Sequence, residues 1–206
     1  MTLRMVTSLP RAGTLILVML VALLAGCASA GKTMDKAMSA IGLSKPETPP
    51  PGTTKVNLPV HIFAGGNLNA GSGKKPLALV VKVYQLRSLQ RFEQTPFDSF
   101  LDADKERAAL GDDLVSSHET LVLPSQHYDI TETLPDDVPY LGIVALFRAP
   151  AAQRWRYAYD VKASMPAGVT LGAHACALSS TAGKLVTDLA DDPGSLASAR
   201  CPDMAH

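Results

Sequence analysis

The stretch WRYAYDV, residues 155–161, alternates between apolar and more polar side chains. Successive side chains of a strand point to opposite faces of a sheet, so this alternation predicts a β-strand. One face carries Trp155, Tyr157, Tyr159 and Val161, and the other carries Arg156, Ala158, Asp160 and Lys162.

Short strand-like runs separated by turn residues occur on both sides of this stretch. They are residues 55–63, 77–86, 114–123, 128–134, 140–148, 169–179 and 184–189. Pro59 lies inside the first run and places it at a sheet edge or a bulge, because proline cannot donate a ladder hydrogen bond. Seven or eight short strands with frequent turn signals predict a mainly β protein, a two-sheet β-sandwich.

Residues 87–114 differ from these runs because their apolar side chains recur at helical spacing. Those side chains are Phe92, Phe97, Phe100, Leu101 and Leu110. Thr95 is a candidate N-cap before Pro96, and Gly111 is a candidate stop. We expect one or two helices here, inserted between strands and packed on a sheet face.

The N-terminus has the layout of a secretory signal peptide. Arg4 and Arg11 precede an apolar run over residues 15–24, which ends in Leu24-Ala25-Gly26-Cys27. A Cys directly after small residues is typical of the bacterial lipobox, in which the thiol receives a diacylglyceryl group and becomes the mature N-terminus. The alternatives are an ordinary signal peptide with an incidental Cys and an uncleaved anchor, although the run is short for a span of ~20 residues.

We therefore expect lipid attachment at Cys27, since two lipid chains already give stable membrane anchoring. Ala28 follows it, and the absence of an Asp at this position is typical of lipoproteins sent to the outer membrane. Gly, Ser, Pro and Lys then dominate up to residue 54 and indicate a flexible tether. The expected divisions are a signal peptide over 1–26, the tether over 27–54, a β-sandwich domain over 55–190 and a C-terminal tail over 191–206.

Charge and cysteine content bound the function further. Lys plus Arg and Asp plus Glu number 19 each, and a near-neutral chain without a basic cluster argues against a nucleic-acid surface. With Cys27 assigned to lipid, Cys176 and Cys201 remain, and in an oxidising compartment they most simply form one disulfide. The alternatives are two unpaired thiols, or a metal site with His174, for which no C-x-x-C pattern is present.

Motifs for catalysis and cofactor binding are weak. His118-Glu119 and His127-x-Asp129 bring imidazole and carboxylate close in sequence, but neither has the spacing of H-E-x-x-H. Ser125 near His127 lacks a G-x-S-x-G elbow and a third partner. The Gly-rich residues 65–73 are not followed by a helix that would aim N–H groups at a phosphate. We expect no active site, no metal and no cofactor.

The stretch AGGNLNAGSGKKP, residues 64–76, is too long for a tight hairpin turn and predicts a projecting loop. Because loops carry much of protein recognition, we expect partner binding here, with Leu68 as a candidate apolar anchor. The alternative is a mobile loop without a function. The candidate contact residues are Gly65, Gly66, Asn67, Leu68, Asn69, Ala70, Gly71, Ser72 and Gly73.

Several stretches follow one another in the order found in a known family. Besides the lipobox they are NLN (67–69), PLALVVKVYQL (76–86), Phe92, FDSF (97–100), LGDDL (110–114), LP (123–124), YLGIVALFR (140–148) and WR (155–156). With this set, the chain resembles the outer-membrane lipoprotein of bacterial type VI secretion systems, the TssJ or SciN/VasD-like family. The resemblance covers most of residues 55–160 and does not include the Cys176 and Cys201 pair.

The resemblance implies a transthyretin-like β-sandwich with a short helical insertion and no catalytic activity. It also implies a place on the inner leaflet of the outer membrane, where the protein binds the periplasmic C-terminal region of a large inner-membrane component. The loop between the first two strands, here 64–76, is implicated in that contact. Two other classes remain open: a periplasmic carrier binding a small apolar ligand or glycan between its sheets, and an envelope hydrolase using His127 and Ser125.

Overall fold

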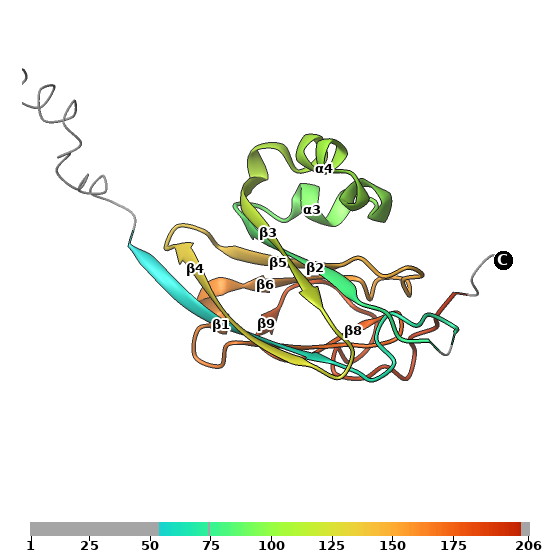
Figure 1. Cartoon of the computed structure of the whole chain (residues 1–206). Coiled ribbons are helices and arrows are strands. Elements are labelled where there is room, and N and C mark those ends of the chain that lie inside the picture. The colour runs from blue at the N-terminus through green and yellow to red at the C-terminus, as the bar shows by residue number, and fades with distance from the viewer. Residues whose placement is uncertain (1–53, 74, 203–206) are drawn as a thin grey trace, which may run out of the picture. The chain divides into compact units, whose positions relative to one another are not determined.

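The structure is a computed structural model that describes residues 54–73 and 75–202 (Figure 1). All of these residues belong to one unit of the chain, Gly52–His206. The predicted signal peptide, the lipobox over 24–27 and residues 27–53 of the predicted tether lie outside the described residues.

Four strands form the first sheet, called sheet A, in the order β4-β1-β7-β8. Its members are β1 (Lys55–Ala64), β4 (His127–Pro135), β7 (Val169–Ala173) and β8 (Leu178–Ala182). β1 runs parallel to β7, while the other neighbouring pairs are antiparallel.

Five antiparallel strands form the second sheet, called sheet B, in the order β3-β2-β5-β6-β9. Its members are β2 (Leu79–Leu86), β3 (Leu114–Val122), β5 (Tyr140–Ala145), β6 (Arg156–Asp160) and β9 (Lys184–Leu185). The two-sheet β-sandwich predicted from the sequence is thereby confirmed.

The inner faces of the two sheets share one apolar core. From β1 the core takes Leu58, Val60 and Ile62, each 0 % exposed. From β6 it takes Tyr157 and Tyr159, so the alternation predicted for 155–161 is confirmed. Ala158 points to the opposite face and is also buried, because a second apolar cluster covers that side of sheet B.

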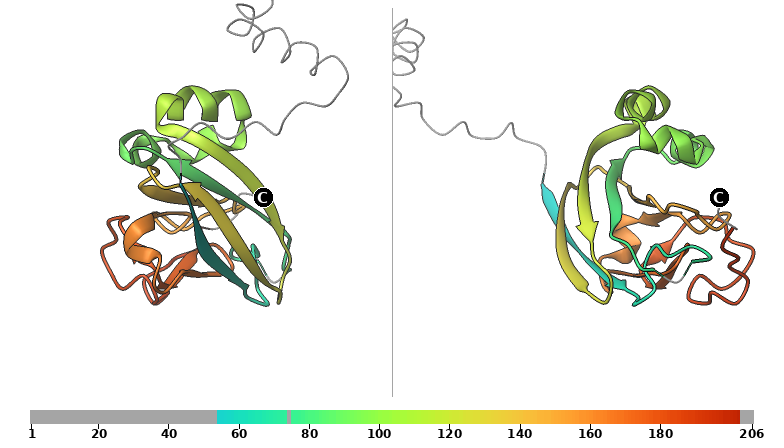
Figure 2. Two further views of the ribbon diagram at one scale, coloured as in Figure 1. Left: turned by 90° about the vertical axis from the view of Figure 1, so that its left-hand side faces the viewer. Right: turned by 45° about the vertical axis from the view of Figure 1, so that its right-hand side comes forward.

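The helical insertion that builds this second cluster lies on the outer face of sheet B (Figure 2). It consists of α3 (Gln90–Gln94), η1 (Phe97–Leu101), α4 (Ala103–Leu110) and η2 (Gly111–Asp113), and a further short helix, α5 (Val161–Ser164), follows β6. Phe92, Phe100 and Leu110 pack against Tyr84 and Leu86 of β2. The insertion predicted for residues 87–114 is therefore confirmed, since this burial of aromatic surface holds the short helices on the sheet.

The caps of these helices differ from the prediction at one position. Thr95 does not begin a helix; it follows α3, and its hydroxyl donates to the carbonyl of Arg91 at 2.6 Å. Asp102 instead caps α4 by accepting from the N–H groups of Asp104 and Lys105. Gly111 ends α4 as predicted, at a φ of 50° that favours glycine.

Arg156 joins the insertion to sheet B. Its guanidinium donates to three carbonyl oxygens at the end of α3, those of Phe92, Glu93 and Thr95. The last carbonyls of a helix carry partial negative charge, so a cation is well placed there. The same guanidinium lies 4.7 Å from the ring centroid of Trp155. The WR pair at 155–156 therefore fixes where the insertion sits.

A buried ion pair makes the second junction. Lys82 of β2 pairs with Glu106 of α4, and with Glu119 of β3 at 3.1 Å. Burial alone would lower the pKa of Lys82, but the two carboxylates outweigh it and raise the pKa above its usual value. The ammonium therefore stays charged, and loss of one partner would leave an uncompensated buried charge.

β1 is an interior strand, so the prediction that Pro59 marks an edge or a bulge is wrong. The carbonyl of Pro59 faces Gly168, which precedes β7, and the ring nitrogen faces the same side. Pairing with β7 begins only at Val60, so no ladder bond is required from Pro59 on that side.

The predicted strand over 169–179 is two strands. The chain turns back at residues 174–177, where the N–H of His174 donates to the carbonyl of Ala177 at 3.0 Å, and β7 and β8 pair across this turn. The last predicted run, 184–189, contributes only the two-residue β9.

β1 runs from one end of the sandwich to the other (Figure 1). Its ten residues span about 33 Å. The end at Lys55, where the chain enters the sandwich, is called the entry end, and the end at Ala64 is called the loop end. None of the helices in the described ranges is long and apolar enough to cross a membrane.

Candidate binding site at the loop end

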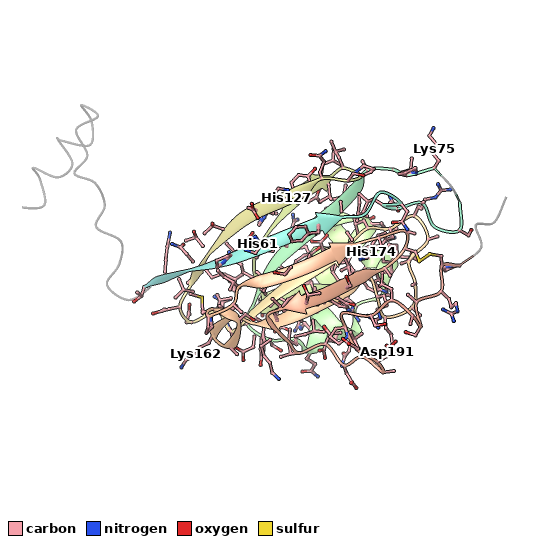
Figure 3. The ribbon with its side chains drawn as sticks, turned by 90° about the horizontal axis from the view of Figure 1, so that it is seen from below. His61, Lys75, His127, Lys162, His174 and Asp191 are labelled. Carbon is pink, nitrogen blue, oxygen red and sulfur yellow. A yellow bond between two sulfur atoms is a disulfide. The ribbon has the colours of Figure 1, made fainter. Side chains whose placement is uncertain are left out.

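Connections between strands converge at the loop end. They are residues 64–78, 123–126, 146–154 and 174–177. The first of these contains the predicted binding loop, 64–76. Figure 3 shows Lys75 of that loop and His174 of the last connection at the same end of the sandwich.

The first half of the loop is a chain of tight turns fastened to sheet A. Three backbone N–H groups of the loop donate to consecutive carbonyls of residues 173–175: Gly65 to Ala173, Asn69 to His174, and Gly71 to Ala175, at 2.8, 2.9 and 2.8 Å. Gly71 has a φ of 62°, which explains a glycine there. The loop is therefore held in a defined shape by the turn between β7 and β8.

Asn69 fixes the loop to sheet B as well. Its side-chain amide nitrogen donates to the carbonyl of Ala78 at 2.9 Å, and its side-chain oxygen accepts from the N–H of Arg148 at 2.9 Å. Its own φ is 52°, a left-handed conformation that Asn tolerates better than most residues. One buried amide thus connects loop 64–76 to the residue before β2 and to the connection after β5.

Leu68 is not an exposed anchor, so that prediction is wrong. Its side chain is 0 % exposed and belongs to the core between the sheets. The exposed members of the predicted contact set are Gly66, Asn67, Ser72 and Gly73. The only large apolar residue of the loop stabilises it from below, which leaves a polar, glycine-rich tip for contacts.

Cys176 and Cys201 form a disulfide, with their Cα atoms 5.5 Å apart (Figure 3). The bond fastens the C-terminal tail to the turn that holds the loop. Both sulfur atoms are used by this bond, so no thiolate is left for the alternative metal site with His174. The N–H of Ala151 donates to the carbonyl of Cys176 at 2.8 Å, which adds the 146–154 connection to the same assembly.

Arg154 holds the tail at a second point. Its guanidinium, only 3 % exposed, donates to Asp191 at 2.8 Å and to the hydroxyl of Tyr157 at 3.0 Å. It also reaches the carbonyls of Asp192 and Pro193. The tail is therefore part of the folded unit and braces the loop end from one side.

Two histidines lie near the carboxylate of Asp129 of β4: His61 of β1 and His127 of β4 itself. On the outer face of sheet A, His61 Nδ1 and Asp129 Oδ1 lie 2.6 Å apart, and His127 Nε2 lies 3.5 Å from Asp129 Oδ2. The hydrogen bond from His61 holds the pKa of Asp129 below its usual value. Within the described residues, no hydrogen bond joins Ser125 to His127, so the hydrolase alternative has no nucleophile–base pair here.

Two further pairs involve buried groups. Burial raises the pKa of Glu132, which lies 3.1 Å from Nε2 of His118 at the β3 and β4 side of the core. His174 Nε2 lies 3.0 Å from the hydroxyl of Ser179, and burial lowers the pKa of this imidazole. Within residues 54–73 and 75–202, no three His, Cys, Asp or Glu side chains gather so that they could hold a metal ion.

The space between the sheets is filled by fully buried side chains. Four hollows among the described residues are open to solvent. Two are of 390 Å³ beside α3 and of 340 Å³ on sheet A. The other two are of 460 Å³ each, one beside the tail at Arg154 and Leu189 and one at the entry end beside Val56, Val138 and Met165. A carrier would need a deep apolar pocket with convergent polar groups. The packed core gives the carrier alternative no support.

The fold and this end of it define a class of protein: a two-sheet β-sandwich with helices inserted after its second strand and an ordered loop after its first. The chain belongs to the family described as "Type VI secretion lipoprotein, VasD, EvfM, TssJ", whose model matches residues 56–176, more than half of the sequence. The resemblance seen in the sequence is thereby confirmed.

Solved structures share the fold. The lipoprotein TssJ1 from Pseudomonas aeruginosa is 25 % identical, with a TM-score of 0.52, over 63 % of this chain and 97 % of that chain. A chain of a structure described as the TssM C-terminal domain from EAEC is 18 % identical, with a TM-score of 0.53, over 62 % of this chain and 98 % of its own. A chain of a type VI membrane complex is 20 % identical, with a TM-score of 0.55, over 61 % and 97 %. A search of curated proteins found no match.

The sequence did not predict the roles of Arg148 and Arg154. Arg148 lies at the end of an apolar run and two residues before Pro150, a position that indicates the end of a strand. Arg154 lies four residues after that proline, and nothing local distinguishes it from a solvated arginine. Its role depends on Asp191, which is distant in the sequence.

Proposed function

We propose that the chain is a non-enzymatic structural lipoprotein of a type VI secretion membrane complex. It is anchored through Cys27 to the periplasmic face of the outer membrane, and its loop 64–76 binds the periplasmic C-terminal region of TssM, the large inner-membrane component. The observation that carries this proposal is the loop itself, since its backbone and Asn69 are fastened on both sides while its tip stays exposed.

A preformed loop is suited to binding because little conformational freedom is lost when the partner docks. The family is one of type VI secretion lipoproteins, and chains with this fold occur in structures described as a type VI membrane complex and as the TssM C-terminal domain. These similarities support TssM as the partner. A role without catalysis is supported by the lack of a hydrogen bond between Ser125 and His127 in the described part of the chain and by the disulfide that occupies Cys176 and Cys201.

Deleting the loop is a poor test of this contact, because it would also remove the buried Leu68 and Asn69 and so disturb the fold. Ser72→Trp instead adds bulk at the exposed tip and leaves both residues in place. We expect the affinity for the TssM periplasmic domain to fall about tenfold or more, since a bulky side chain at the centre of an interface prevents close packing. Binding is measured by titration with the full mature chain in detergent.

The matched control is Lys162→Trp, which places the same side chain in α5 at the entry end (Figure 3). Thermal unfolding of both variants establishes that they are folded. If Ser72→Trp binds TssM as tightly as the wild-type chain, the assignment of the contact to the loop is wrong.

A further inference from the structure

An exposed apolar strip crosses the outer face of sheet B at the loop end. The N–H of Leu146 donates to the carbonyl of Val80, and Val80 lies opposite Leu121 of β3. Val81 next to Val80 points into the core, so Val80 and Leu121 point outward. Leu121 is 58 % exposed, and Leu123, two residues further on, is 47 % exposed. Leu121 at the end of β3 and Leu123 just after it therefore give the outer face an exposed apolar patch.

Asn69 fixes the backbone of the residues that follow this strip, among them the exposed Arg148. Its side chain accepts from the N–H of Arg148, two residues after Leu146. It also donates to the carbonyl of Ala78, two residues before Val80. The strip therefore continues toward the loop tip with the exposed Arg148 on one side and Leu123 on the other. Lys75, also exposed, stands in the same loop end (Figure 3). We call Lys75, Leu121, Leu123 and Arg148 the apolar–basic surface.

No negative charge from the neighbouring connections offsets these cations. Residues 64–78, 120–127 and 146–154 contain no Asp or Glu. Within the described part of the chain, neither Lys75 nor Arg148 takes part in an ion pair. The nearest acid along β3, Glu119, is paired with Lys82, and Asp191 of the tail is paired with Arg154.

We infer that the apolar–basic surface receives an acidic segment of TssM that also carries apolar side chains. This inference rests on the proposed function and names the chemistry of the partner's surface. Opposite charges on two partners accelerate their encounter and fix their orientation, while apolar contacts slow dissociation. An anionic membrane offers the same charge, but it carries that charge on headgroups outside its apolar interior. A protein segment presents carboxylates and apolar side chains next to one another, which matches the apolar–basic surface, so a protein is the better occupant.

The test uses the full mature chain in detergent and the TssM periplasmic C-terminal domain as the probe. We expect Lys75→Glu/Arg148→Glu to weaken binding about tenfold or more, mainly through slower association. Raising the salt from about 50 mM to about 500 mM should weaken wild-type binding and reduce the difference between the two proteins. Leu123→Ser should weaken binding with no change in its salt dependence, and Lys162→Glu at the entry end should bind as the wild type does.

The outcomes separate the two proposals. If the charge reversal leaves affinity and salt dependence unchanged while Ser72→Trp prevents binding, the loop is the contact and the inference is wrong. If neither variant changes the affinity, the proposed function fails with it. Vesicle binding is measured on the unacylated Cys27→Ser chain, so that the lipid does not mask the surface. If the charge reversal abolishes its binding to vesicles containing phosphatidylglycerol but does not weaken binding to TssM, the surface faces a membrane and the inference is overturned.

Discussion

Asn69 holds the loop in place through both its backbone and its side chain. It combines a left-handed backbone with two side-chain hydrogen bonds to main-chain groups of two different segments, one just before β2 and one just after β5. Those groups, the carbonyl of Ala78 and the N–H of Arg148, would lose their partner if the amide were removed. A buried polar group without a partner costs free energy, so the position is sensitive to truncation.

We expect Asn69→Ala to lower the free energy of unfolding by about 2–4 kcal/mol, because two hydrogen bonds are lost and alanine is strained at this φ. Denaturation in urea measures the change. Asn67→Ala is the matched control, since this residue is exposed, and it should stay within about 0.5 kcal/mol of the wild type. Equal effects of the two substitutions would contradict the role assigned to Asn69.

The turn between β7 and β8 joins the disulfide to loop 64–76. Its carbonyls at residues 173–175 accept from Gly65, Asn69 and Gly71, and the next residue, Cys176, is bonded to the tail. A crosslink between residues 25 apart in sequence stabilises a folded chain by about 3 kcal/mol in the chain-entropy model. The tail therefore supports the loop through a covalent bond to the turn that holds it.

We expect Cys201→Ser to lower the free energy of unfolding by about 3 kcal/mol. Hydrogen exchange at the amides of Gly65, Asn69 and Gly71 should become faster, because the turn that holds them is no longer fastened to the tail. An amide on the distant β1–β4 ladder, such as that of Val56, serves as the internal control. Exchange that accelerates equally at all of these amides would mean that the disulfide stabilises the whole fold and does not brace the loop in particular.

The sequence predicts those elements whose pattern is local. The alternation over 155–161 and the helical spacing over 87–114 each depend on a few neighbouring residues, and both were confirmed. The prediction of an edge strand or a bulge from Pro59 is wrong because a proline is tolerated where pairing with the next strand has not yet begun. That strand, β7, lies over 100 residues later in the sequence. The tight turn at 174–177 was missed because it contains neither Gly nor Pro.

The candidate site was predicted less completely than the fold. The loop at 64–76 stands out by composition, but composition does not reveal which of its side chains point inward. Leu68 was assigned to the surface because the stretch around it is polar, whereas tertiary packing places it in the core. Arg148 and Leu123 join the loop only through pairings across sheet B, which a single sequence does not display.

At the scale of the whole molecule, the entry end and the loop end lie at opposite ends of β1. The insertion covers sheet B, while the exposed tip of the loop, Arg148 and the disulfide all belong to the loop end (Figures 1 and 3). β1 therefore separates the point where the chain enters the sandwich from loop 64–76 by about 33 Å. This polarity suits a protein that connects one membrane to a partner from another.

We predict that Cys27→Ser releases the protein from the outer membrane and abolishes type VI secretion, because removal of the acylated residue removes the anchor. Ala28→Asp is the matched variant: it keeps the lipid but should retain the protein at the inner membrane, and secretion should be lost as well. Membrane fractionation and a secretion assay measure the two effects. A soluble Cys27→Ser protein that supports full secretion would disprove the need for anchoring.

The disulfide also gives the molecule an order of events in its biogenesis. Thiols stay reduced in the cytosol and become oxidised after export. If the chain is exported as its N-terminus predicts, the bond between Cys176 and Cys201 forms only after translocation. Before that step loop 64–76 lacks part of its support, so maturation of the loop end is the later event.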